Sequence, residues 1–419
     1  MQSILVVGSG LAGLSAARAA RSLGFDGSLT IVGDEHERPY DRPPLSKDYL
    51  SGALPRDSLG LETDTDDLDA RWLLGVCAVS LDPATRNVRT SDGGELHADG
   101  VVLATGSAAM LPTDLTGPDG ARPANLTTLR TVADADRLRD QLRPGRQLVI
   151  VGAGLIGTEV AATARARGCK VAVLARESVP LARIYGAEMA VHVAAVHDRH
   201  GVELIREAFV DRVEIVDSTV RSITLTSGRV LPSDIVLVAV GARPGTDWLV
   251  GSGLELGDGV VCDSHGRTSA AGIVAVGDCA AWFDRHLERA HRTQHWTDAL
   301  ERPVLATAAL LGVEAPRQKP HLPYFWSDQY DLRIQMAGYA SLADSVRVEQ
   351  GDPGTGAFLA LYRRGDDPVA VLGVSQPREF TRWRKTIAAA LASTSVQTRP
   401  SADAAPAASG PAPYETPST

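Results

Sequence analysis

The chain has 419 residues, and its 51 acidic and 42 basic side chains give a formal net charge of −9. This acidic balance argues against general affinity for nucleic acid or for an anionic membrane surface, and no apolar run reaches the length of a membrane span. A chain of this length can form two or three domains, each with a core of its own. Because the sequence enters an apolar strand within three residues, we expect no signal peptide and a cytoplasmic protein.

The first predicted element is a buried strand over residues 3–7, which is followed at once by a glycine-rich turn. Apolar and small residues then continue at helical spacing as far as Leu23. In such a strand–turn–helix unit, Gly8 permits the tight turn, Gly10 lets backbone N–H groups approach a pyrophosphate, and Gly13 lets helix and strand pack closely.

The second predicted strand, residues 29–33, ends at Asp34 and Glu35. A carboxylate about 20 residues beyond the last glycine of the turn is where such units bind a ribose hydroxyl. The turn, the helix and this acidic strand end together predict a dinucleotide-binding site.

A second copy of this unit begins near residue 147, and its glycines repeat those of the first copy at one constant spacing. Two dinucleotide sites in one chain indicate that one nucleotide is a fixed redox cofactor and that the other is diffusible. The matching glycines are Gly8 with Gly152, Gly10 with Gly154, Gly13 with Gly157 and Gly24 with Gly168.

Three further apolar runs, at 101–106, 236–241 and 273–277, each end in glycine and predict strands whose ends approach a nucleotide. We therefore expect an α/β fold with two Rossmann-like dinucleotide-binding domains and a C-terminal α+β domain. The expected boundaries are 1–114 with 237–319 for the first domain, 115–236 for the second, 320–394 for the C-terminal domain and 395–419 for a disordered Pro/Ala-rich tail.

The most specific stretch is the loop RPYDRPPLSKDYL, residues 38–50. Together with the two glycine turns, it resembles the FAD-dependent NAD(P)H–ferredoxin reductases that serve bacterial oxygenases and cytochromes P450, and the likeness extends to about residue 390. The resemblance implies an oxidoreductase that passes electrons from NADH or NADPH through FAD to a ferredoxin. A flavin is needed because hydride carries two electrons and an iron–sulfur protein accepts one, so the difficult chemistry belongs to the cofactor.

The resemblance also implies roles for single residues. In the family, this loop carries an arginine and a lysine against the flavin, which here are Arg42 and Lys47. Its paired prolines hold the loop extended, and a lysine there can stabilise negative charge on the reduced ring. Asp34, or its neighbour Glu35, would take the adenosine ribose.

In the same way, Asp278 would hold the ribitol chain, and Trp296 falls where the family places a residue on the flavin ring. The family usually has an acid at the position of Gln294, so the role of that position stays open. The remaining residues implied for FAD are Gly8, Gly10, Ala12, Gly13, Val79, Ala104, Thr105, Gly106 and Arg130.

For the nicotinamide nucleotide, the resemblance places Glu159 across the pocket from Lys47, and these two are the implied catalytic pair. The other residues expected for NAD(P) are Gly152, Gly154, Ile156, Gly157 and Gly241, together with Arg176, which comes from aligning the two copies.

The two copies differ at the strand end that selects the nucleotide. Aligning residues 171–175 with the first copy puts Arg176 where Asp34 stands, and Ala175 where the family has its NAD-selecting glutamate. A carboxylate favours NADH by accepting from the 2′-hydroxyl, whereas an arginine accommodates a 2′-phosphate. We therefore expect NADPH to be accepted at least as well as NADH, unless Glu177 turns toward the ribose or Arg176 faces solvent without a role.

The four cysteines are widely scattered and form no C-x-x-C pair, so the sequence shows no redox disulfide and no metal site. Relatives that reduce disulfides or peroxide use a cysteine beside the flavin. Because no cysteine lies in the loop at 38–50, we expect electrons to leave to an external protein. Trp326 matches a family aromatic near the flavin edge and either lines that exit or packs in the core.

Basic residues cluster at 285–292 and 378–385, where they would steer an acidic ferredoxin unless each segment is only a solvated helix face. Two other functions stay open. One is an NAD(P)H oxidase or small-molecule reductase on the same scaffold. The other is a non-enzymatic redox-sensing flavoprotein, which the net charge disfavours because such proteins tend to use basic surfaces for DNA.

Overall fold

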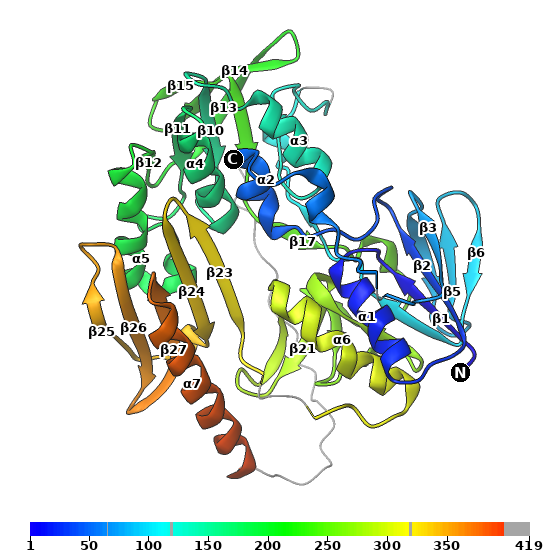
Figure 1. Ribbon diagram of the computed structural model, residues 1–419. Coiled ribbons are helices and arrows are strands. Elements are labelled where there is room, and N and C mark those ends of the chain that lie inside the picture. The colour runs from blue at the N-terminus through cyan, green and yellow to red at the C-terminus, as the bar shows by residue number, and fades with distance from the viewer. Residues whose placement is uncertain (65, 118–119, 318–320, 398–419) are drawn as a thin grey trace.

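The structure is a computed structural model that describes residues 1–64, 66–117, 120–317 and 321–397. It contains two parallel five-stranded sheets and a C-terminal antiparallel sheet, which confirms the expected fold class. Figure 1 shows the first unit beginning in blue, the second unit in green, and the yellow-to-orange C-terminal sheet beside the second unit. Within the described ranges, no helix is long and apolar enough to cross a membrane.

The first parallel sheet has the order β20-β7-β1-β2-β3. Its central strands bury mostly apolar side chains, and helices α1 and α6 pack over the sheet and exclude water. The strands are β1 (Ser3–Val7), β2 (Ser28–Gly33), β3 (Ala70–Leu74), β7 (Gly100–Leu103) and β20 (Ile273–Ala275), and the helices are α1 (Leu11–Ser22) and α6 (Trp296–Leu311).

The second parallel sheet has the order β12-β11-β10-β16-β9 and repeats the same plan around α4. Its core joins Leu148 and Ile150 of the central strand to Val160 and Ala164 of that helix. The elements are β9 (Leu126–Thr127), β10 (Gln147–Val151), β11 (Lys170–Leu174), β12 (Glu203–Ile205), β16 (Ile235–Val238) and α4 (Leu155–Ala166).

The repetition extends beyond the glycine turns, because each unit carries a three-stranded antiparallel sheet just before its β7 or β16 strand. The first is β4 (Ala78–Asp82), β5 (Asn87–Thr90) and β6 (Glu95–His97), and the second is β13 (Val210–Val216), β14 (Thr219–Leu225) and β15 (Val230–Pro232).

The C-terminal sheet lies between two helices. Tyr185 and Met189 of α5 pack on one face, and Phe380 and Ile387 of α7 pack on the other. The sheet has the order β23-β24-β27-β26-β25. Its elements are β23 (Tyr324–Gln329), β24 (Leu332–Gly338), β25 (Ser345–Asp352), β26 (Ala357–Arg364) and β27 (Asp367–Val374), with α5 (Ala182–Arg199) and α7 (Pro377–Gln397).

Shorter elements connect these parts. The remaining strands are β8 (Ser107–Ala109) paired with β17 (Ala242–Pro244), and β18 (Leu256–Gly257), β19 (Gly259–Cys262), β21 (Ala280–Asp284) and β22 (Arg289–Arg292) in one sheet. The remaining helices are α2 (Asp48–Ser51) and α3 (Val132–Gln141), with the 3₁₀ turns η1 (Pro43–Ser46), η2 (Arg56–Leu59), η3 (Thr113–Leu115), η4 (Asp247–Leu249), η5 (Gly277–Cys279) and η6 (Ala340–Leu342).

Two of the expected boundaries need correction. The boundary between residues 236 and 237 falls inside β16, which pairs with β10 from Ile235 to Val238 and so belongs wholly to the second unit. Helix α7 continues to Gln397, so residues 395–397 are helical. The rest of the expected tail, 398–419, lies outside the described residues.

The glycines of the two turns serve different needs. A Cβ atom at Gly157 would lie 2.2 Å from the carbonyl oxygen of Gly152, so helix α4 can approach its strand only without a side chain there. A Cβ atom at Gly154 would meet nothing within 4 Å, and the backbone φ of this residue is an ordinary −78°. The protein therefore needs Gly157 for its own packing, whereas the small size of Gly154 leaves room for something outside the chain.

Substitutions at these two glycines should have different effects. Gly157→Ala should lower the free energy of unfolding by about 1–3 kcal/mol, because the new methyl group is forced against backbone. Gly154→Ala should unfold at nearly the wild-type denaturant concentration but bind dinucleotide more weakly. Urea denaturation and nucleotide titration of both variants test this, and equal stability losses would contradict it.

Candidate active site

A cavity of about 760 Å³ opens at the carboxyl ends of β1, β2 and β7, where open parallel sheets place their ligands. Its volume falls within the roughly 300–1,000 Å³ typical of cofactor sites. The residues implied for FAD that line it are Gly8, Gly10, Ala12, Asp34, Glu35, Arg42, Lys47, Ala104, Thr105, Gly106, Arg130, Asp278 and Trp296.

The other parts of the chain complete the cavity wall. Ile156 and Glu159 of α4 and Phe325 and Trp326 of β23 also line it, as does Gln294. Both parallel-sheet units and the C-terminal sheet therefore meet at one cavity.

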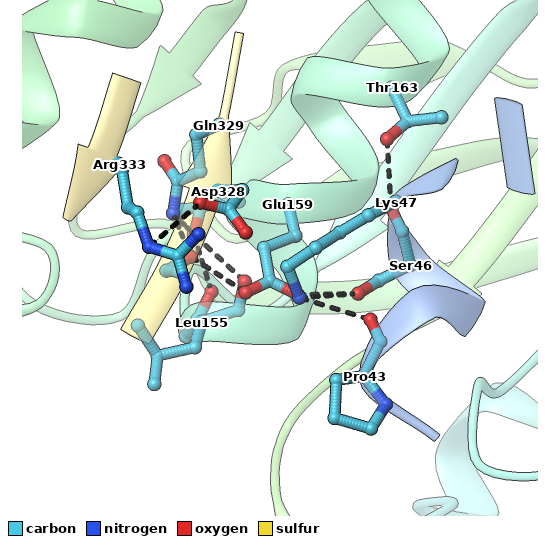
Figure 2. A network of polar contacts seen from close by, with 12 residues as sticks. Pro43, Ser46, Lys47, Leu155, Glu159, Thr163, Asp328, Gln329 and Arg333 are labelled. Atoms are coloured by element: carbon cyan, nitrogen blue, oxygen red, sulfur yellow. Dashed lines mark hydrogen bonds and ion pairs between the residues drawn. The ribbon is translucent and has the colours of Figure 1, made fainter. Parts of the chain in front are cut away.

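Glu159 is the buried anion of this cavity, since its side chain is only 3% exposed. The Nζ atom of Lys47 lies 2.6 Å from its Oε2 atom, and the two side chains point toward one another (Figure 2). Lys47 directly follows η1, and its ammonium group also donates to the carbonyl oxygen of Pro43 at 3.1 Å. The structure thus brings together the pair that the family resemblance implies.

Three polar side chains that the sequence analysis missed complete this network. Ser46 donates to Oε2 of Glu159, and Ser327 donates to Oε1 at 2.6 Å. Gln329 in turn donates its Nε2–H to the Ser327 hydroxyl at 2.9 Å. Because a desolvated carboxylate is costly unless it is paired, these donors allow Glu159 to stay buried. Ser327 and Gln329 stand at alternate positions of β23 and so share one face with Phe325, which was the available signal.

Asp278 and Arg130 form a second ion pair in the cavity wall. Arg130 Nη2 donates to Asp278 Oδ2 at 2.8 Å, and Ser107 donates to the same oxygen at 3.1 Å. Arg130 lies just before Thr131, which caps helix α3 with its side chain. Arg130 therefore positions Asp278, besides facing the cavity itself.

The two acids at the end of β2 differ in their surroundings. Glu35 is held by Arg42 Nη2 and by the Tyr40 hydroxyl, both at 2.5 Å, whereas Asp34 is exposed. Burial raises the pKa of Tyr40, so its hydroxyl remains a donor to the carboxylate. Both acids line the cavity, but only Glu35 has a fixed orientation.

Aromatic rings lead from the cavity to the last helix. Trp296, the first residue of α6, donates Nε1–H to Asp41 at 2.7 Å and meets Trp326 edge to face, with 5.9 Å between ring centroids. Trp326 in turn stacks on Tyr324 at 6.0 Å, and the guanidinium carbon of Arg384 lies 4.1 Å from the Tyr324 ring centroid.

The cavity fits a bound group that has polar atoms. A Cβ atom at Gly10 would meet nothing within 4 Å, so the turn is open toward the cavity. His295 Nδ1 and Trp248 Nε1 line the cavity and are buried, and neither has a hydrogen-bond partner among the described residues. Burial lowers the pKa of His295, so the ring is neutral and able to donate or accept.

Two residues implied for FAD lie outside the cavity. Val79 on β4 is 46% exposed, and its neighbours Val76, Cys77 and Ala78 line the cavity in its place. Val79 lies where the register of β4 on β5 shifts, between Ala78 and Ser80. Gly13 lies beneath the turn, where a Cβ atom would be 1.9 Å from the Gly8 carbonyl oxygen, so its role is in packing.

Most residues implied for NAD(P) lie around the carboxyl ends of the second sheet rather than in the cavity. Only Ile156 and Glu159 line the cavity, and Ile156 is 43% exposed. The residues outside it are Gly152, Gly154, Gly157, Arg176 and Gly241.

The cysteines do not form a redox pair in the described part of the chain. All four are free, and Cys77, the exposed one, is also the one that lines the cavity. In the same ranges, no cluster of three histidine, cysteine or acidic side chains is arranged to hold a metal ion.

The fold defines a protein with two Rossmann-like dinucleotide-binding units, and the Lys47–Glu159 ion pair joins these units at the cavity wall. Comparison with known proteins supports this class of protein. The chain belongs to the pyridine nucleotide-disulphide oxidoreductase family, whose sequence profile matches residues 2–302, and a reductase C-terminal profile matches residues 324–406.

Individual relatives match over nearly the whole chain. The probable ferredoxin reductase CtmF of Castellaniella defragrans is 34% identical, with 92% of this chain and 93% of the relative covered. The ferredoxin–NAD(+) reductase component of the biphenyl dioxygenase system of Paraburkholderia xenovorans is 35% identical, with 91% and 92% covered. Among solved structures, the covalent putidaredoxin reductase–putidaredoxin complex matches with a TM-score of 0.88 and 31% identity, covering 93% of both chains.

The buried ion pair predicts a stability effect. Lys47→Met leaves the Glu159 carboxylate with hydroxyl donors only, and breaking a buried pair from one side costs about 3–5 kcal/mol. The double variant Lys47→Met/Glu159→Gln removes the charge and should recover much of this loss. Urea denaturation of both variants tests it, and a double variant no more stable than Lys47→Met would show that the charge is not what destabilises the single variant.

Proposed function

We propose that this protein is an FAD-dependent reductase that passes electrons from NAD(P)H to a ferredoxin. The observation that carries the proposal is a cavity shared by all three parts of the chain: the glycine turn of the first unit, Glu159 of the second unit and Trp326 of the C-terminal sheet all line it. The names of the relatives support it, since they are ferredoxin reductases of oxygenase systems.

FAD would occupy the cavity along the first unit. The open turn at Gly10, at the N-terminus of α1, would receive the pyrophosphate, and Glu35 or Asp34 would take the ribose. Asp278 would face the ribitol chain and Trp296 the ring. When bound, FAD accepts two electrons together and releases them singly.

The nicotinamide nucleotide would lie along the second unit, with its pyrophosphate at Gly154 and its nicotinamide near Ile156 and Glu159. Lys47 and Glu159 are the proposed catalytic pair. Lys47 offers a positive charge at the cavity, and Glu159, fixed by its four-residue network, keeps that ammonium group in one place.

Electrons would leave past Trp326 toward the surface near Arg384. The two basic segments form one surface there, because Leu287 of the β21–β22 turn and Trp383 of α7 pack on the same apolar cluster. Arg285, Arg289 and Arg382 are exposed on it, whereas Arg292 is only 8% exposed and pairs with Asp258. Such a surface would dock an acidic ferredoxin, which serves a cytochrome P450 or a ring-hydroxylating oxygenase.

We further propose that the protein works in the cytoplasm. NAD(P)H is available there, and a reducing compartment suits four free cysteines of which one is exposed.

Bound FAD is directly testable. The purified protein should be yellow and should release FAD on heating, and Asp278→Ala should lose FAD more readily because Arg130 then faces the cavity unpaired. Absorbance and fluorescence of the released cofactor measure this. A folded, colourless protein that cannot be reconstituted with FAD would overturn the proposed function.

Charge reversal on the basic surface tests whether ferredoxin docks there. Reversing Arg382 and Arg384 to glutamate should slow ferredoxin-dependent cytochrome c reduction and flatten its salt dependence, while ferricyanide reduction stays normal. Arg347→Glu, an exposed arginine on β25, is the matched control. If both activities fall together, the segment is structural. If oxygen or a quinone is reduced fast without any ferredoxin, the oxidase alternative is favoured.

A further inference from the structure

The strand pairing fixes which residues of the two units correspond. Val7 pairs with Val32 in the first sheet, and Val151 pairs with Leu174 in the second. The glycine that follows each first strand donates its N–H to the last of these residues, Gly8 to Val32 at 2.7 Å and Gly152 to Leu174 at 3.0 Å. Counting on from these equivalent bonds, Arg176 stands at the position of Asp34.

The backbone beyond β11 fixes the direction of Arg176. Ala175 donates to the carbonyl of Ile205 and accepts from the N–H of Ala208, both at 2.9 Å, and its methyl group is fully buried. The next residue, Arg176, is therefore turned outward at the carboxyl edge of the second sheet, and Phe209 follows Ala208 beside it.

Arg176 and Phe209 form a pair at this edge. The guanidinium carbon of Arg176 lies 5.6 Å from the ring centroid of Phe209, and Phe209 is 44% exposed. A ring below the guanidinium limits its motion but leaves its N–H groups free, and they make no hydrogen bond within the described residues. An arginine with unused donors next to an exposed aromatic face is suited to a phosphorylated adenosine.

The acid next to Arg176, which would repel a phosphate, forms an ion pair with another residue. Glu177 lies 3.4 Å from Arg183, whose side chain is 87% exposed, so its charge is balanced. Glu207 is the other acid of the adjoining loop, and it is exposed, with its backbone N–H directed to the carbonyl of Glu177. Ala175 offers no side chain to a ribose hydroxyl. Within the described residues, no carboxylate forms an ion pair with Arg176: Glu177 pairs with Arg183 instead, and Glu207 is exposed to water.

We propose that Arg176, held against Phe209, forms a subsite for the 2′-phosphate of NADPH, with Phe209 as a platform for the adenine. This inference rests on the proposed function, because NADPH is the natural ligand only if the protein is an NAD(P)H-dependent reductase. The subsite would then determine which nicotinamide nucleotide the reductase uses. NADPH is then at least as good a donor as NADH.

Binding of nucleotide fragments tests the subsite without any turnover. Calorimetric titration of the FAD-loaded protein should show adenosine 2′,5′-bisphosphate binding roughly tenfold or more tightly than 5′-AMP, the gain expected from a charged hydrogen-bonded pair. Arg176→Ala should abolish this difference with little effect on 5′-AMP. Phe209→Leu should weaken both ligands. Arg221→Ala, an exposed arginine on β14 of the same unit, should change neither.

Equal affinity for the two fragments, or a difference that survives Arg176→Ala, would overturn the proposal. The kcat/KM values for NADPH and NADH in ferricyanide reduction give a second readout, in which Arg176→Glu should shift the preference toward NADH. If neither nucleotide is oxidised, the proposed function fails, but the fragment titration still decides whether the 2′-phosphate subsite exists.

Discussion

The burial of one carboxylate, Glu159, constrains the whole arrangement of this protein. Removing an ionised group from water costs several kcal/mol unless its oxygens are paired, and here the donors come from two places in the chain outside the unit that carries Glu159. Lys47 and Ser46 belong to the proline-rich loop of the first unit, and Ser327 belongs to the C-terminal sheet. The carboxylate can be satisfied only when all three parts are docked, so the same interaction that stabilises the assembly also shapes the cavity.

The two units share their architecture but use their strand ends differently. At the end of β2, an arginine and a tyrosine hold Glu35 in the cavity wall. At the equivalent edge of the second sheet, Arg176 lies over Phe209. The nearby Glu177 forms its ion pair with the exposed Arg183. A permanently bound cofactor suits the first arrangement, because the acid proposed for its ribose, Glu35, is already held by two hydrogen bonds. A diffusible nucleotide suits the second, because its contacts lie at an exposed edge from which it can leave.

Much of this structure depends on residues that are close together in the chain and can therefore be predicted from the sequence. Each glycine turn, with its strand and helix, depends on residues close together in the chain, so the sequence predicts both units, their strand ends and the part of the cavity lining that these turns and strand ends supply. The lysine–glutamate pair was predicted only through the family resemblance, since nothing local relates residue 47 to residue 159. The boundary inside β16 was misplaced because a strand's membership of a sheet depends on its partner β10, not on its own residues.

By itself, the sequence determined that two nucleotide units exist and where their turns, acids and arginine lie in the chain. These features depend on the spacing of apolar residues and on the positions of glycines, which are set within a few residues. Only the tertiary structure decided which side chains meet. Ser327 and Gln329 look like ordinary strand residues until β23 is packed on α4. Val79 looks like a cavity residue until the register shift in β4 leaves it exposed. Phe209 acquires a role only because the backbone bond between Ala208 and Ala175 places it beside Arg176. Such contacts join residues distant in the chain, and their geometry depends on the packing of whole elements.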